Sequence, residues 1–230
     1  MCVSRMRGFI VSNDLRAPSR PPAAGLTPLQ TWALALVPSQ DHYTLIVIDR
    51  NVGLPRAYVW LTLSALIGGI ISTLVSVGVD LVLGPSTNPV LASLGSGTPT
   101  LAGTLNELLF GVPIQTVVIL VAVTIVVGAS QMLASALGGR GTFTQLLYAF
   151  SAFFTPLLFF NSLISSLPLV GVLVIVVGLY ALLLNVIAIK TVHQIGAGRA
   201  FLAGVVTPIG LLVLVSAVAF LVLSVTVPLP

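Results

Sequence analysis

The chain has 230 residues, of which nine are Lys or Arg, five are Asp or Glu, and 57% are hydrophobic. A soluble globular chain carries about 25% charged residues, against 6% here, so the composition excludes a water-soluble globular domain. It also excludes a disordered chain, which needs low hydrophobicity and high net charge. The composition therefore predicts an integral membrane protein.

Residues 1–56 are predicted to form a cytoplasmic tail. The apolar run Phe9–Val11 is shorter than the core of a signal peptide, about 7–15 residues, so no cleavage is expected. The single cysteine, Cys2, excludes an intramolecular disulfide. Within the tail, Leu29–Val37 and Tyr43–Ile48 are each too short to cross a bilayer. They predict a short amphipathic segment at the membrane interface, with strand and helix both open for Tyr43–Ile48.

Five long apolar windows follow, and a helix needs about 20 such residues to cross the hydrocarbon core. The expected spans are residues 57–82, 114–137, 143–164, 168–189 and 200–226. The segment from Gly84 to Pro113 is expected to form an outer loop, and its part from Gly84 to Leu105 reads as irregular because it is rich in Gly, Ser, Thr and Pro. The prediction is an all-α, polytopic bundle of five transmembrane helices over residues 57–230.

The basic residues supply an orientation, because Lys and Arg collect on the cytoplasmic side. With five spans, all nine fall on the side of the N-terminus and none on the other. This distribution predicts a cytoplasmic N-terminus and an external C-terminus. Adding or removing one span would place basic residues on both sides of the membrane.

Small residues recur at four-residue spacing in the first two spans, a pattern that lets helices pack closely in lipid. They are Ser64, Gly68, Ser72 and Ser76 in the first span and Ser130, Ala134 and Gly138 in the second. They indicate packing inside the bundle or a docking face for another membrane protein. Pro156 and Pro208 are expected to kink their helices, which would shape the bundle or gate a path through it.

The sequence contains few residues of the kinds that catalysis or transport requires. Apart from Asp80, which closes the first apolar window, no Asp, Glu, Lys, Arg or His lies within the expected spans, which argues against proton-coupled transport and leaves a neutral-solute path open. The two histidines, His42 and His193, form no paired metal motif. We therefore expect no metal, no cofactor, no nucleic-acid partner and no enzymatic activity, with His193 as a pigment ligand being the minor alternative.

The stretch from Gly138 onward resembles the Yip (Ypt-interacting protein) domain family. Gly138-Gly139-Arg140-Gly141-Thr142-Phe143, then Gln145-Leu146-Leu147 and Thr155-Pro156, are similar to the start of that family's third helix. Val192-His193 and Gly198-Arg199-Ala200 resemble its loop before the last helix. The resemblance extends over roughly residues 29–225.

The resemblance implies an all-helical five-span domain with a cytoplasmic N-terminus. It also implies partners, since eukaryotic members are linked to small GTPases through their tails. Their Asp-Leu-Tyr-Gly-Pro motif is absent here, which argues against GTPase binding. The short basic tail resembles bacterial members and implies a bacterial cytoplasmic membrane.

Four residues are expected to meet at one cytoplasmic mouth, namely Arg140, Lys190, His193 and Arg199. Such basic pockets can hold anionic lipid headgroups, although the same residues also serve as ordinary positive-inside anchors. The sequence thus favours a non-enzymatic scaffold or adaptor that works through membrane lipids and other membrane proteins. Two alternatives stay open: an accessory subunit of a large photosynthetic or respiratory complex that holds lipids or pigments, and a small neutral-solute transporter or channel.

Overall fold

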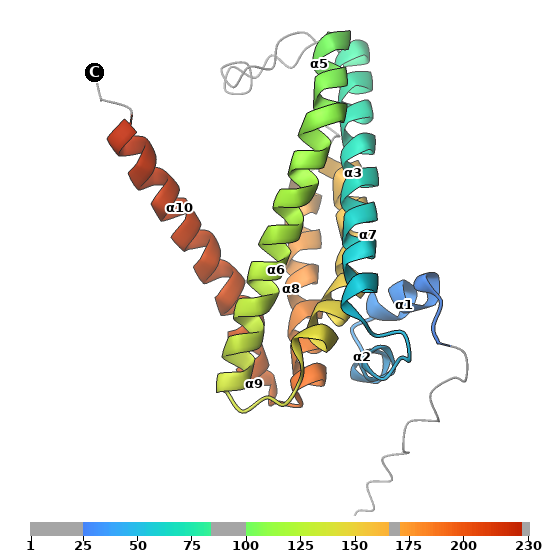
Figure 1. Ribbon diagram of the computed structural model, residues 1–230, viewed down its shortest axis with the longest axis vertical. Coiled ribbons are helices and arrows are strands. Elements are labelled where there is room, and N and C mark those ends of the chain that lie inside the picture. Colours follow the sequence, from blue (N-terminus) through green and yellow to red (C-terminus); the bar gives the residue numbers. More distant parts are fainter. Residues whose placement is uncertain (1–24, 84–99, 166–170, 227–230) are drawn as a thin grey trace, which may run out of the picture.

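The computed structural model describes residues 25–83, 100–165 and 171–226, and every regular element in these ranges is helical (Figure 1). The elements are α1 (Pro28–Ala35), α2 (Gln40–Val47), α3 (Leu54–Leu83), α5 (Leu101–Asn106), the π-helix η1 (Glu107–Gly111), α6 (Val112–Ala136), α7 (Phe143–Ser165), α8 (Gly171–His193), α9 (Ala197–Phe201), the π-helix η2 (Leu202–Val206) and α10 (Thr207–Thr226).

Five helical stretches are long and apolar enough to cross a membrane: Leu54–Val79, Leu101–Ala136, Phe143–Ile164, Leu173–His193 and Ala197–Ala217. The prediction of an all-α protein with five transmembrane helices is confirmed. In lipid every backbone polar group must be satisfied internally, which is why long apolar segments become helices there.

Capping boxes form at the N-termini of helices α1 and α7. Thr27 and Gln30 form a capping box at α1, followed by Pro28 in the first turn. Thr142 and Gln145 do the same for α7, because each side chain bonds the backbone N–H of the other at 3.1–3.3 Å. These boxes fix where the chain enters each helix.

Helix α7 is the centre of the bundle. Half of its spanning window is buried, against 17–22% in the other four spans. The run Leu146–Phe153 is buried without interruption, so this part of the helix is covered on every side. A helix buried all round must be apolar all round, and its Phe-rich sequence meets that requirement.

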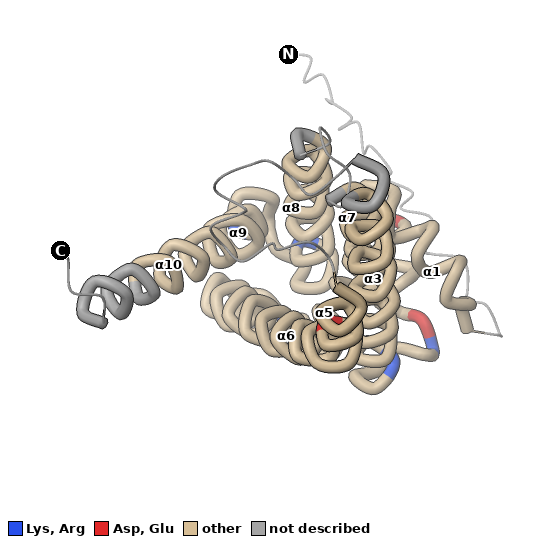
Figure 2. Tube along the Cα trace, turned by 90° about the horizontal axis from the view of Figure 1, so that it is seen from above, with Lys and Arg blue, Asp and Glu red and all other residues tan. Residues whose placement is uncertain are grey.

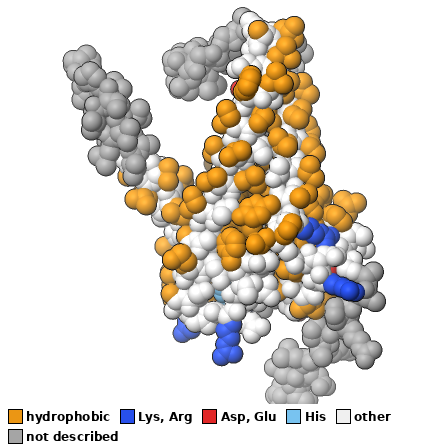
Figure 3. Space-filling view, in the orientation of Figure 1, with side chains coloured by type: hydrophobic (Ala, Val, Ile, Leu, Met, Phe, Trp, Pro, Cys, Tyr) orange, Lys and Arg blue, Asp and Glu red, His pale blue; other side chains and the backbone are white. Residues whose placement is uncertain are grey.

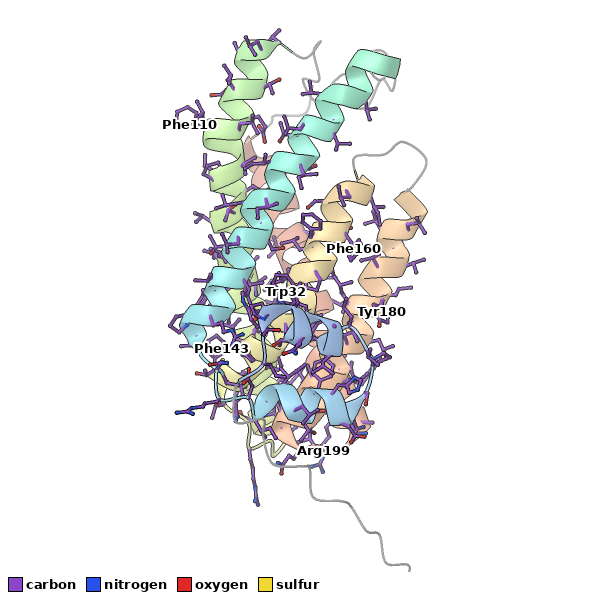
Figure 4. The ribbon with its side chains drawn as sticks, turned by 90° about the vertical axis from the view of Figure 1, so that its right-hand side faces the viewer. Trp32, Phe110, Phe143, Phe160, Tyr180 and Arg199 are labelled. Carbon is purple, nitrogen blue, oxygen red and sulfur yellow. The ribbon has the colours of Figure 1, made fainter. Side chains whose placement is uncertain are left out.

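The two short helices α1 and α2 pack against α7 and α8 rather than standing apart from the bundle (Figure 4). Tyr43 on α2 is fully buried, donates a hydrogen bond to the Ala35 carbonyl at 2.8 Å and packs on Phe153. Tyr180 of α8 donates to the Leu36 carbonyl. The segment Tyr43–Ile48, which the sequence left undecided, is thus mostly helix α2.

The expectation of an outer loop up to Pro113, irregular as far as Leu105, is wrong for residues 101–113, which are helical. The structure has one continuous helix from Leu101 through Ala136, in which η1 joins α5 to α6. Thr100 caps its start by accepting from Gly103 N at 3.0 Å, and the wider turn of η1 directly precedes Pro113. Residues 84–99 of the expected loop lie outside the described part of the chain.

Helix α10 leaves the bundle at an angle (Figures 1 and 2). Its base lies beside α6, while four consecutive residues farther along, Leu212–Val215, are each about 60% exposed or more. This divergence leaves apolar helix surface facing outward.

The described basic side chains share one end of the molecule, where α3 and α7 begin and α6 and α8 end (Figure 3). They are Arg50, Arg56, Arg140, Lys190 and Arg199. We call this the basic end. Glu107 lies in η1, toward the opposite end of the long helix.

Candidate functional site

The turn between α6 and α7 builds one wall of the basic end. Gly138 has φ +91°, a left-handed conformation that glycine adopts without steric cost. The Gly138 and Gly139 N–H groups bond the carbonyls of Ser135 and Ala134 at 3.0 and 2.9 Å. Arg199 Nη1 caps the Leu137 carbonyl at 3.2 Å. The last carbonyls of α6 are therefore satisfied although the helix stops.

The next glycines let the turn touch the end of α8. A Cβ on Gly139 would lie 2.8 Å from both the Ala134 carbonyl oxygen and His193 Cβ. A Cβ on Gly141 would lie 2.6 Å from the Val192 carbonyl oxygen. Any side chain at either position forces the turn away from α8, so the Gly-Gly-Arg-Gly sequence is explained by close backbone approach.

A partly buried hydrogen-bond chain holds this contact in place. Gln131 Nε2 donates to the Gly141 carbonyl at 2.8 Å, which leaves Gln131 Oε1 as the acceptor for His193 Nε2 at 2.9 Å. His193 Nε2 therefore carries a proton in this arrangement. His193 is 1% exposed and its Nδ1 has no partner among the described residues, so the ring fastens α8 to the turn.

A cavity of about 580 Å³ opens beside this turn, between α2, the start of α7 and the end of α8. Its lining mixes polar and aliphatic side chains: Gln40, Thr44, Val47, Ile48, Arg140, Gln145, Lys190, Thr191, Val192, Gln194 and Ile195. We call it the basic-end cavity. Ligand sites commonly measure about 300–1,000 Å³ and combine apolar walls with a few polar groups.

The basic-end cavity carries positive charge that no acid among the described residues neutralises. Arg140 and Lys190 both line it, and the ion pair found in the described ranges, Arg56 with Asp49, does not involve either. Gln194 lines the same cavity with φ +54°, a conformation uncommon outside glycine. The chemistry of this cavity is that of an anion site with an adjoining apolar wall.

The four residues expected at the mouth are neighbours but not equivalent. Arg140 N bonds the His193 carbonyl at 3.3 Å, and Arg140 and Lys190 face the basic-end cavity. His193 is buried in the Gln131 contact, and Arg199 is engaged with Leu137. Neither of these two lines the cavity.

The small residues of α3 are used inside the bundle, where α3 and α7 make the most extensive contact among the described helices. Ser64 Oγ donates to the Thr155 carbonyl at 2.7 Å, and a Cβ on Gly68 would lie 2.6 Å from Ser162 Oγ. Ser72 lies beside Ser162 in a small cavity of about 110 Å³ shared with α6. Ser130 and Ala134 are buried on α6.

Two members of that pattern do not pack. Ser76 is exposed, because α3 extends past the part of α7 that covers its earlier turns. Gly138 is exposed as well and belongs to the turn rather than to a helix face. Regular spacing marks a face, but the partner helix must be long enough to cover it.

The two prolines expected to kink helices lie in different settings. Pro156 is inside α7, which stays helical around it. Pro208 follows η2, and having no N–H it leaves the Gly204 carbonyl without its i+4 donor. Asn185 Nδ2 on α8 donates to that carbonyl at 2.8 Å, so a side chain replaces the missing bond.

A second cluster, which sequence analysis missed, ties the N-terminal helices to the bundle. Asp49 accepts hydrogen bonds from Leu26 N at 3.1 Å and from Tyr148 Oη at 3.0 Å, and it pairs with Arg56 at 3.7 Å. Arg56 Nη2 returns a bond to the Leu26 carbonyl at 2.8 Å and stacks over Trp60. We call this set the Asp49 lock.

Asp49 and Arg56 are seven residues apart, and this spacing alone does not predict the Asp49 lock. The other partners of Asp49, Leu26 and Tyr148, are distant from it in the sequence. The nearest clue is that Asp49 has apolar neighbours on its N-terminal side, and a buried carboxylate requires partners. Over the described ranges, no group of three or more His, Cys, Asp or Glu could hold a metal ion.

Comparison with known proteins gives one match. The model of the Yip1 domain matches residues 34–220. Neither the search of curated proteins nor the search of solved structures finds a match. The matched range runs from the end of α1 into α10 and includes the glycine turn and the basic-end cavity.

Proposed function

Since the chain belongs to the Yip1 domain family, as the resemblance indicated, and is an integral membrane protein, we propose that it is a non-enzymatic membrane scaffold that holds anionic lipid headgroups in the basic-end cavity. The observation that carries this proposal is the pairing of Arg140 and Lys190 on one cavity of about 580 Å³ without an acidic partner among the described residues.

The geometry supports a headgroup in particular. Arg140 and Lys190 supply two positive charges, and the side-chain amide of Gln145 supplies a hydrogen-bond donor at the same cavity, because its oxygen is occupied by Thr142. Val47 and Ile195 add an aliphatic wall, which a lipid with a glycerol backbone contacts and a free inorganic anion does not. Basic pockets between helices at the cytoplasmic surface bind lipid headgroups in this way.

The same proposal places the basic end in the cytoplasm, because positive loops are retained there. The membrane would then be a bacterial cytoplasmic membrane, with the N-terminus inside and the C-terminus outside. Lipid held at the basic end would lie next to α2, where other membrane proteins could contact it. This arrangement suits an adaptor whose partners are membrane proteins.

Native mass spectrometry of the purified protein tests the proposal. We expect anionic phospholipid to stay bound in mild detergent and to be lost in the double variant Arg140→Gln with Lys190→Gln. The matched control is Arg50→Gln, which removes an exposed charge at the same end but outside the cavity. Equal retention of anionic lipid by all three proteins would refute the proposed function.

A further inference from the structure

Helix α2 forms one wall of the basic-end cavity, and it lies across the bundle rather than along it (Figure 4). Gln40, Thr44 and Val47 line the cavity from α2, and their spacing of four and three residues places them on one face of that helix. The other wall, with Arg140 and Lys190, belongs to the α6–α7 turn and the end of α8. A ligand held between the two walls therefore contacts α2 only while α2 is docked.

The attachment of α2 itself to the bundle is limited. Its buried side chains, Tyr43 and Ile46, belong to the apolar core. Thr44 donates to the Gln40 carbonyl of its own helix at 2.9 Å, and among the described residues no hydrogen bond joins a cavity-lining side chain of α2 to α7 or α8. Helix α2 has eight residues, and isolated helices shorter than about 12–15 residues are marginal in water. We therefore expect α2 to keep its structure only while it is docked.

The bonds that fasten α2 come from the residues that flank it. Before α2, the Leu36 carbonyl accepts from Tyr180 of α8. After α2, Asp49 accepts from Tyr148 of α7 at 3.0 Å and pairs with Arg56 at 3.7 Å. No member of the Asp49 lock lines the basic-end cavity, so the lock acts on the docking of α2 without contacting a ligand there.

The wall opposite α2 carries two like charges. Arg140 and Lys190 repel each other, and no acidic residue in the described part of the chain lines the cavity. Docking of α2 replaces water beside these charges with protein, which strengthens their repulsion. An anion bound to both relieves it, so anion binding and the docking of α2 favour each other.

We propose that α2 is the movable wall of the basic-end cavity, and that its docking and the binding of an anionic headgroup stabilise each other. This inference rests on the proposed function, since it takes an anionic phospholipid as the ligand. A ligand that binds only the docked state lowers the population of the undocked state by a factor of 1 + [L]/Kd, and the effect is reciprocal. The Asp49 lock sets the same equilibrium from outside the cavity.

Hydrogen exchange of the full chain in phosphatidylcholine nanodiscs with increasing phosphatidylglycerol measures this coupling. At a phosphatidylglycerol level about ten times its Kd, exchange in α1 and α2 should slow about tenfold, while exchange in α10 stays unchanged. The slowing should be lost in the Arg140→Gln, Lys190→Gln variant and kept in Arg50→Gln. If native mass spectrometry shows bound phosphatidylglycerol but exchange in α1 and α2 does not change, the movable wall is wrong and the proposed function stands. Absence of bound lipid overturns both.

Thr44→Glu supplies the anion from α2 itself. Relative to the neutral variant Thr44→Gln, its α1 and α2 should exchange more slowly in pure phosphatidylcholine, retain less phosphatidylglycerol and show no further slowing when that lipid is added. An undiminished response to phosphatidylglycerol in Thr44→Glu contradicts the proposal, and if that variant does not fold, the wild-type titration still decides. Glycerol 3-phosphate added to phosphatidylcholine nanodiscs is the last arm, because slowing equal to that with phosphatidylglycerol rejects a lipid as the ligand.

Discussion

At the residue scale, glycine in this protein is required where two backbones meet and dispensable where space is open. Gly141→Ala places a methyl group 2.6 Å from the Val192 carbonyl oxygen, so either the α6–α7 turn or α8 must move. Overpacking of this kind costs about 1–3 kcal/mol. We expect a lower midpoint of thermal unfolding in detergent for this variant.

Gly198→Ala is the control for Gly141→Ala, and we do not expect it to lower the unfolding midpoint. Gly198 lies within helix α9, and a Cβ there meets nothing within 4 Å. Alanine is favoured over glycine in a helix by about 1 kcal/mol, so Gly198→Ala should leave the unfolding midpoint unchanged or raise it. If both variants destabilise equally, close approach is not the reason for Gly141.

Tyr43 gives a pH dependence with a definite sign. Burial raises the pKa of the Tyr43 hydroxyl above its usual value of about 10. Burial thus favours the neutral form, whose contribution to stability is complete below about pH 10 and is lost as the pH rises further. Amide hydrogen exchange in α1 and α2 should accelerate above that pH beyond the intrinsic rate.

The Tyr43→Phe variant supplies the comparison. It loses the bond to the Ala35 carbonyl, a loss of about 1 kcal/mol, and it loses the ionisable group as well. Its α1 and α2 should exchange faster at neutral pH but show no additional alkaline step. An alkaline step of undiminished size in the variant would assign the titration to another group.

At the element scale, the Asp49 lock holds α1 and α2 on the bundle. Asp49→Ala leaves Arg56 and the Tyr148 hydroxyl without their partner, and breaking a buried pair costs about 3–5 kcal/mol, an upper bound here because Arg56 is partly exposed. Hydrogen exchange should increase across α1 and α2 and much less across α7. Asp41→Ala, on an exposed position of α2, is the control, and equal effects of the two variants would rule out a lock.

Asn185 and Pro208 should be coupled energetically. Asn185→Ala leaves the Gly204 carbonyl without its donor, and an unpaired buried polar group costs about 1–3 kcal/mol. Pro208→Ala restores a backbone N–H at the i+4 position, so the loss caused by Asn185→Ala should be smaller in that background. A double-mutant cycle on unfolding midpoints measures this coupling, and purely additive effects would show that Asn185 does not replace the missing bond.

The elements also show what the sequence could and could not predict. The five spans followed from the scarcity of charge, because a few polar residues cut the chain into membrane-length windows. The start of the second long helix at Leu101 was missed, since its first turn has loop-like composition and η1 accommodates Pro113. The Asp49 lock was missed because its bond to Tyr148 joins residues 99 positions apart, which no local pattern records.

The candidate site was likewise predicted only in part, because local sequence patterns do not record contacts between distant residues. Arg140 and Lys190 flank helix ends that adjacent spans bring to one level, so topology alone placed them together. Topology could not show that His193 points into the bundle toward Gln131. It also gave no sign that α2 would close one side of the basic-end cavity, because a short interfacial segment can dock on any helix.

At the scale of the whole molecule, the proposed function requires the basic end to face the cytoplasm. Cys2 is the only cysteine, so it reports the side of the N-terminus directly. A membrane-impermeant maleimide should label Cys2 only after cells are permeabilised. In a Cys2→Ser background, Leu101→Cys at the opposite end of the molecule should be labelled in intact cells; the reverse pattern would invert the proposed topology.

If the basic-end cavity holds an anionic headgroup, as we propose, photocrosslinking should identify the residues that contact it. A phosphatidylglycerol with a photoreactive group on its headgroup is incorporated into membranes that contain the protein, and the crosslinked residues are mapped by mass spectrometry. We predict crosslinks concentrated on Thr44, Val47 and Gln194 and lost in the Arg140→Gln, Lys190→Gln variant. Crosslinks spread evenly over the basic end, or unchanged in that variant, would contradict headgroup binding in the basic-end cavity.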